Sequence, residues 1–110
     1  MKEDINSNSD LFKRVNSMTI EDIRKVLLQF VSKYSITSII LFGSRAEGTN
    51  TDSSDVDLII EFSVPVTLIT LSRLRMDLEE ALGLEVDVIH GPLSSSDMIE
   101  VTKEVVLYAA

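Results

Sequence analysis

The sequence predicts an α/β fold in which helices pack against a small sheet of about three strands. Two apolar runs rich in β-branched residues, 36–42 and 55–62, have the composition of strands. Between the second run and a third short one at 84–90, leucines recur at helical spacing over 67–82. The length of 110 residues suffices for one hydrophobic core but not for two. We therefore expect a single unit with the order helix, strand, turn, strand, helix, strand, helix.

The first helix is expected to begin after Thr19, which with Asp22 has the spacing of a capping box. Apolar side chains then recur at helical spacing, at Ile20, Ile23, Leu27, Phe30 and Tyr34. The buried strand 36–42 follows. Because residues 43–54 are polar and contain glycine, we expect a turn or a very short helix there.

The second strand, 55–62, alternates in polarity, as a strand with two different faces does. One face carries Val56, Leu58 and Ile60, and the other carries Asp55, Asp57 and Ile59. The helix over 67–82 is expected to end at Gly83. The third strand spans 84–90. A final helix is predicted to start within 94–97 and to reach Tyr108, with its apolar residues on a buried side.

The composition narrows the classes of function. The net charge is −8, from 10 Lys and Arg against 18 Asp and Glu, which argues against direct binding to a nucleic-acid backbone. There is no cysteine, so any metal would need oxygen ligands or the single histidine. Charges at residues 2–4 and the absence of a long apolar run predict a cytoplasmic protein with no membrane partner. Residues 1–17 are polar and are expected to form a flexible tail.

Three acidic residues stand in segments predicted to be strands, where Asp is disfavoured. Asp55 and Asp57 lie two apart and project from the same face. Asp87 lies between two valines of the third strand and so belongs to the face opposite them. If the two strands are neighbours, the three carboxylates converge. Their repulsion would then be relieved by a divalent cation, and ligation by oxygen alone suits Mg²⁺.

Such a cluster could hold two metal ions for an in-line displacement at phosphorus. In that scheme Asp55 and Asp57 bridge the metals and bind a nucleoside triphosphate, while Asp87 holds the ion beside the acceptor and orients or deprotonates its hydroxyl. The alternative is structural. Asp55 could cap a turn, Asp57 could be an exposed strand residue, and Asp87 could pair with a basic side chain.

A glycine turn follows the first strand. Gly43 would permit close approach of the backbone to a phosphate, and Ser44 would add a hydroxyl donor. Arg45 could reach the same anion or lie on the surface. A P-loop is excluded, since Thr49 and Asn50 stand where that motif needs Lys and Ser or Thr. Gly43, Ser44 and Arg45 are thus the predicted nucleotide-binding residues.

Two segments together resemble the signature of a known family: Gly43-Ser44-Arg45-Ala46-x-Gly48 and, five residues later, Ser54-Asp55-x-Asp57-Leu58. This is similar to the DNA polymerase beta type nucleotidyltransferase superfamily, in particular its small MNT branch. The resemblance covers about residues 19–110, so we expect a nucleotidyltransferase domain over 18–110. It implies a mixed sheet and Mg²⁺-dependent transfer of AMP or another nucleotidyl group. It also implies ATP as donor and metal ligation at Asp55, Asp57 and Asp87.

The resemblance also suggests a biological setting. Minimal members of this family are commonly antitoxins that silence an all-helical HEPN toxin by attaching AMP to a tyrosine. The sequence has no additional helical domain for gripping an acceptor, which favours a protein partner or a homo-oligomer. Two alternatives stay open: a non-catalytic antitoxin that acts by occlusion, and transfer to a small molecule or an RNA end, of which RNA is the less favoured because of the negative charge.

Overall fold

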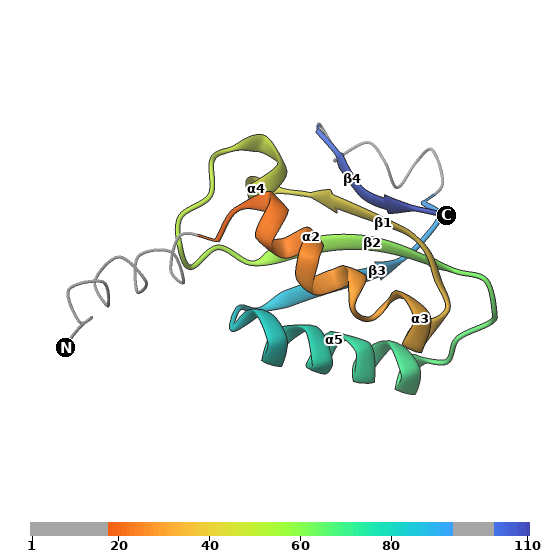
Figure 1. Ribbon diagram of the computed structural model, residues 1–110. Helices are drawn as coiled ribbons and strands as arrows, with labels where there is room; N and C mark the ends of the chain where they lie inside the picture. The colour runs from red at the N-terminus through yellow and green to blue at the C-terminus, as the bar shows by residue number, and fades with distance from the viewer. Residues whose placement is uncertain (1–17, 94–102) are drawn as a thin grey trace.

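The structure, a computed structural model, describes residues 18–93 and 103–110 (Figure 1). Its elements in chain order are α2 (Ile20–Leu28), α3 (Val31–Tyr34), β1 (Ile36–Phe42), α4 (Ser44–Glu47), β2 (Val56–Phe62), α5 (Leu68–Leu82), β3 (Val86–His90) and β4 (Val105–Ala109). In the described segments the sheet has the order β3-β2-β1-β4, with β2 and β3 parallel and the other pairs antiparallel. The predicted α/β class and mixed sheet are confirmed, with four strands instead of about three.

The first helix starts as predicted but is shorter. Thr19 Oγ1 accepts from the Asp22 backbone N–H at 3.0 Å, and the Asp22 carboxylate accepts from the Thr19 N–H at 3.0 Å, which completes the capping box. The chain then leaves the helix after Leu28, and the separate α3 ends at Ser35 in the left-handed conformation, with φ of 56°. The apolar spacing continues across the break because both helices pack on the same core.

Helices α2, α3 and α5 lie together over one face of the sheet (Figure 1). Strands β1 and β2 present their apolar faces to this layer, with Ile39 opposite Ile60 in the antiparallel register. From α5 the buried side chains are Leu74, Leu78 and Leu82. Gly83 ends this helix with φ of 70°, as predicted. The strand expected at 36–42 and the short helix expected within 43–54 are both present.

The predicted final helix is wrong over its last part. Residues 94–102, where it was expected to start, lie outside the described residues, but Val105–Ala109 forms strand β4, antiparallel to β1. Leu107 is buried, whereas Val106 is 56% exposed. Pairing with β4 also engages backbone groups of β1 on the side away from β2, which would otherwise be an open sheet edge. That long-range pairing decides the conformation of a segment whose local pattern also fits a helix.

Two further predictions concern the N-terminal tail and the membrane. The flexible tail expected at 1–17 lies outside the described residues. Within 18–93 and 103–110, no helix is both long enough and apolar enough to cross a membrane.

Candidate active site

The parallel pairing of β2 with β3 places two of the predicted acids opposite each other. Val56 donates its N–H to the Glu85 carbonyl at 2.9 Å, and in the register that follows Asp57 is the direct partner of Asp87. Residues that face each other across a pair of strands project from the same side of the sheet. Asp57 is partly buried, and Asp87 is exposed. Strands β2 and β3 are therefore neighbours, which is the condition for the predicted convergence of carboxylates from the two strands.

The carboxylates of Asp55 and Asp87 act electrostatically on Asp57. Burial raises the pKa of the Asp57 carboxyl above its ordinary value of 3.8, and the nearby carboxylates of Asp87 and Asp55 raise it further. Asp55 lies just before β2 and is exposed. The negative charges of Asp87 and Asp55 thus disfavour the ionised form of Asp57. A cation bound here would offset that repulsion.

The residues fit a magnesium ion only if the substrate supplies further ligands. Among the residues that the structure describes, no three acids or histidines lie close enough together to hold a metal ion. Mg²⁺ in nucleotide sites commonly binds through one or two carboxylates together with phosphate oxygens and water. The facing pair Asp57 and Asp87 matches such a partial ligand set. The donor chemistry therefore suits an ion that enters with a triphosphate.

Gly43 brings the glycine turn against the acids. Phe42, at the end of β1, pairs with Asp57, and the chain then turns at Gly43 with φ of 76°. A Cβ built on Gly43 would overlap the carboxylate of Asp57. Glycine is thus needed here twice, for its positive φ and for the space that it leaves. The predicted phosphate turn and the predicted metal-binding acid are in contact.

Ser44 begins the four-residue helix α4 and is partly exposed. Among the described residues, no hydrogen bond engages its hydroxyl, although its carbonyl accepts from the Thr49 N–H at 3.0 Å. Ser44 directly follows Gly43, the residue that lies against the Asp57 carboxylate. This position leaves the Ser44 hydroxyl available to a ligand at the turn.

Arg45 lies neither on the surface nor with its donors open to an anion. Its side chain is buried, with 4% exposure, and its guanidinium donates to backbone carbonyls. Nε and Nη2 donate to the Ser54 carbonyl at 3.1 and 3.0 Å, and Nη2 also reaches the Asp52 carbonyl at 3.2 Å. The predicted role of Arg45 in binding nucleotide is not supported by this geometry, because those donors are used by the protein. A buried arginine in a polar segment has no signature in hydrophobic periodicity.

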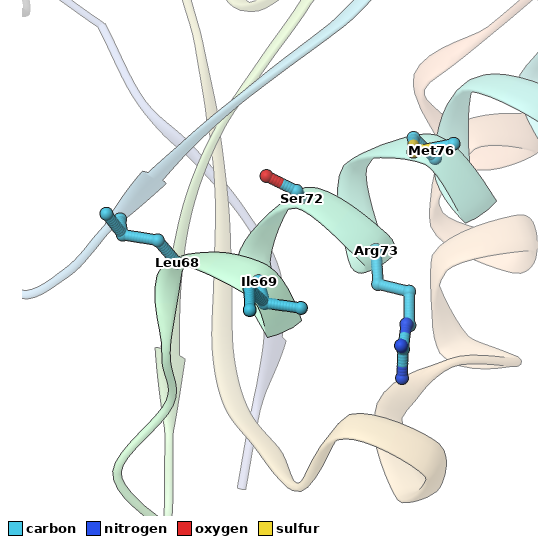
Figure 2. A pocket seen from close by; sticks show the side chains of 5 residues that line it. All are labelled: Leu68, Ile69, Ser72, Arg73 and Met76. Atoms are coloured by element: carbon cyan, nitrogen blue, oxygen red, sulfur yellow. The ribbon is translucent and has the colours of Figure 1, made fainter.

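A separate hollow of about 310 Å³ lies on the outer side of α5 (Figure 2). It is lined by Leu68, Ile69, Ser72, Arg73 and Met76. The beginning of α5 lies at the opposite end of the sheet from α4 (Figure 1). This hollow is mainly apolar and has Arg73 as its charged lining residue. It does not combine acids with a phosphate-binding turn, so we place the chemistry at β1, α4, β2 and β3.

A small mixed sheet, with facing aspartates on parallel strands and a glycine turn packed against one of them, is an arrangement that can bind a phosphate group together with a metal ion. The comparison with known proteins makes this more specific. Residues 23–107 match the family described as the nucleotidyltransferase domain, and the chain belongs to that family. It is therefore an enzyme of the nucleotidyltransferase class, in agreement with the resemblance seen in the sequence.

Two relatives indicate which members of the family the chain resembles. Protein adenylyltransferase MntA of Thermococcus cleftensis is 32% identical over 94 residues, which cover 81% of this chain and 95% of that protein. A Methanocaldococcus jannaschii protein, provisionally named protein adenylyltransferase MJ0435, is 36% identical over 72 residues, covering 66% of this chain and 77% of its own length. The chain is thus similar to MntA-like proteins over most of its length.

Solved structures agree on the fold. A toxin-antitoxin crystal structure with AMP-PNP superposes with a TM-score of 0.68 at 22% identity, over 79% of this chain and 73% of that one. A second match is the solved complex of a tri-AMPylated Shewanella oneidensis HEPN toxin with MNT antitoxin. A chain of that complex superposes with a TM-score of 0.61 at 18% identity, over 80% of this chain and 71% of that one. At these identities the likeness concerns the fold.

Proposed function

We propose that this protein is a magnesium-dependent adenylyltransferase that moves AMP from ATP to a hydroxyl of a partner protein, as the antitoxin of a HEPN-type toxin. The observation that carries the proposal is the facing pair Asp57 and Asp87 beside the Gly43 turn. The similarity to protein adenylyltransferase MntA supports AMP transfer to a protein. The toxin partner and the ATP donor are supported by the folds of neighbours solved with a HEPN toxin and with AMP-PNP.

The proposed site residues have three roles: phosphate binding, metal ligation and orientation of the acceptor. The backbone N–H groups at Gly43 and Ser44, with the Ser44 hydroxyl, hold phosphate oxygens of ATP. Asp55, Asp57 and Asp87 are the proposed carboxylate ligands of Mg²⁺, and because the described acids do not form a metal site by themselves, phosphate oxygens of ATP would complete the ligand set. When bound, the ion would neutralise charge on the triphosphate and on the departing pyrophosphate. Asp87, which is exposed, would face the acceptor and orient its hydroxyl.

The reaction is one displacement at the α-phosphorus. The acceptor oxygen forms a new bond to this phosphorus while the bond from the α-phosphorus to the oxygen bridging to the β-phosphate breaks. Pyrophosphate leaves with that bonding electron pair, and the proton of the acceptor hydroxyl passes to the Asp87 carboxylate. The products are the adenylylated hydroxyl and pyrophosphate.

The decisive experiment uses α-labelled ATP, Mg²⁺ and a purified HEPN-type toxin protein as the acceptor. Wild-type protein is expected to label that partner, and the double variant Asp55→Asn with Asp57→Asn is expected to lose the label. Glu80→Gln, an exposed change on α5, serves as the control and should label normally. Equal labelling by the double variant would overturn the mechanism. γ-Labelled ATP is run in parallel, since transfer of that label would make the protein a kinase.

A second function is favoured by one observation, that no three described acids or histidines lie close enough to hold a metal by themselves. In this alternative the protein neutralises its partner by occlusion, and the site binds nucleotide without turnover. Full neutralisation of the partner by the double Asp-to-Asn variant would support occlusion. Loss of neutralisation with the complex still formed would exclude it.

A further inference from the structure

We propose that Arg45 is a positioning residue whose guanidinium ties the loop of residues 51–54 to helix α4 and so sets Asp55 and Asp57 against the Gly43 turn. The inference rests on the proposed function for its consequence in catalysis. Its structural part stands on the contacts of Arg45 alone and can be tested without any acceptor.

The hydrogen bonds of Arg45 connect helix α4 to the residue before Asp55. Arg45 follows Ser44, the hydroxyl residue of the proposed phosphate turn, by one position. Its strongest contact, through Nε and Nη2, is the carbonyl of Ser54, which directly precedes Asp55. A single side chain thus connects the two halves of the site, each within one residue of a proposed ligand-binding group.

The loop of residues 51–54 has few other contacts that attach it to the rest of the described domain. Residues 49–53 are exposed and contribute no apolar side chain to the core. Internal bonds close the loop on itself, such as the Thr51 N–H to the Ser54 hydroxyl at 2.8 Å. Such bonds shape the loop but do not attach it to the rest of the domain. Additional bonds from Arg45 to the carbonyls of Asp52 and Thr51, at 3.2 and 3.5 Å, provide that attachment.

Burial of the Arg45 guanidinium has a free-energy cost that its hydrogen bonds must offset. A buried cation is unfavourable unless its donors are satisfied. Arg45 has no ion pair within the described segments, and backbone carbonyls alone solvate it, including that of Met18 ahead of α2 at 3.4 Å. A planar guanidinium can serve several carbonyls in different directions, whereas the ammonium of lysine is a compact point charge. The geometry therefore calls for arginine specifically, and charge alone would not replace it.

The test compares Arg45→Lys with Arg24→Lys. Arg24 is a matched control because it also donates to backbone carbonyls, those of Leu107 and Val106, but at strand β4. In Arg45→Lys we expect amide hydrogen exchange in residues 51–55 to rise about tenfold or more, as for the loss of one charge-assisted hydrogen bond. Affinity for Mg²⁺-ATP should fall by a similar factor. Arg24→Lys should leave both the loop exchange and the nucleotide affinity unchanged.

A second variant separates positioning from general loss of stability. Arg45→Ala leaves a space lined by unpaired carbonyls, which free guanidinium at millimolar concentration should re-enter. We expect guanidinium to restore Mg²⁺-ATP affinity and slow loop exchange in Arg45→Ala, while equal NaCl does neither. The same addition to Asp57→Asn should restore nothing. Failure of guanidinium to restore either quantity would count against the proposal, because a merely destabilised fold is not repaired by a denaturing cation.

The two proposals fail in different ways. If Arg45→Lys shows wild-type loop exchange and wild-type Mg²⁺-ATP affinity, the positioning role is overturned while the transferase function stands. If wild-type protein neither binds Mg²⁺-ATP nor labels a partner, the proposed function fails. In that case faster exchange of residues 51–55 in Arg45→Lys alone would still support the structural part.

Discussion

Gly43 and Asp57 are in direct contact, and the carboxylate of Asp57 occupies the space that any side chain at Gly43 would need. The contact joins the turn after β1 to the acid-bearing start of β2. It gives a physical reason for a glycine at this position in the motif, because both the turn and the acid would otherwise have to move.

Gly43→Ala is expected to destabilise the fold by about 2 to 4 kcal/mol, combining a positive φ with the overlap on Asp57. It should also abolish measurable Mg²⁺-ATP binding. Gly48→Ala is the matched control, since Gly48 has φ of 81° but nothing within 4 Å of an added Cβ. That variant should lose only about 1 kcal/mol and keep its nucleotide affinity. Urea denaturation and calorimetric titration measure both, and equal behaviour of the two variants would contradict the overlap.

Asp57→Asn should raise the Tm of the metal-free protein at neutral pH. A raised carboxyl pKa means that the folded state binds the proton more tightly than the unfolded chain does. The stability that this contributes is present below pH 3.8 and is lost as pH rises through the folded pKa, where Asp57 ionises against its neighbours. The gain from Asn should therefore shrink as pH falls toward 3.8.

Thermal melts of Asp57→Asn at several pH values, without divalent ions, check this sign. Glu80→Gln, an exposed position on α5, should shift the Tm little at any pH. A lower Tm for Asp57→Asn at neutral pH would show that the negative charge of Asp57 is stabilised in the folded protein instead.

Tyr34→Phe should lower the Tm at neutral pH and have less effect in acid. The Tyr34 hydroxyl donates to Asp77 Oδ2 at 2.6 Å, and this bond, followed by the one from Lys33, holds the pKa of Asp77 below 3.8. A lowered carboxyl pKa contributes stability that is present above the unfolded value and lost as pH falls through the folded one. The same contact, after burial, raises the pKa of Tyr34 to about 12.

Melts of Tyr34→Phe across the acid range measure the effect. Tyr108→Phe is the comparison, since no hydrogen bond of the Tyr108 hydroxyl is present among the described contacts. It should change the Tm less than Tyr34→Phe does at neutral pH. A Tyr34→Phe difference that stays constant down to the lowest pH would mean that the carboxylate of Asp77 is not involved.

Leu107→Ala tests the position of strand β4. Because Leu107 is buried in the shared core, its truncation is expected to cost about 2 to 4 kcal/mol of unfolding free energy. Val106→Ala, at a side chain that is 56% exposed, should change stability by less than about 0.5 kcal/mol. Chemical denaturation of the two variants provides the comparison. Similar costs at both positions would be inconsistent with the alternation of buried and exposed residues in β4.

Local sequence was a reliable guide where local interactions decide the outcome. The Thr19 and Asp22 capping box, the strand at 36–42 and the glycine end of α5 were all predicted at their observed positions. Each depends on neighbours within a few residues, or on polarity that repeats with the period of a helix or a strand. The strand predicted at 55–62 is observed as Val56–Phe62, so Asp57 lies in it and Asp55 directly precedes it.

The errors occur where a distant segment decides. Residues 105–109 join the sheet because β1 offers them an edge, and their spacing alone fits a helix equally well. Arg45 is buried because the loop of residues 51–54 folds over it, which no periodicity in α4 foretells. Ile59, on the same face as the acids, is nevertheless buried, and Gly91 packs against it after β3.

By itself the sequence determined the kinds and the order of the elements as far as β3, since propensity, capping and alternation act between near neighbours. Only the tertiary structure decided that β3 lies parallel to β2 with Asp87 opposite Asp57, that β4 completes the sheet, and that Arg45 faces inward. Those outcomes depend on hydrogen bonds and packing between segments far apart in the chain. Such contacts contribute free energy only when the folded chain brings the segments together.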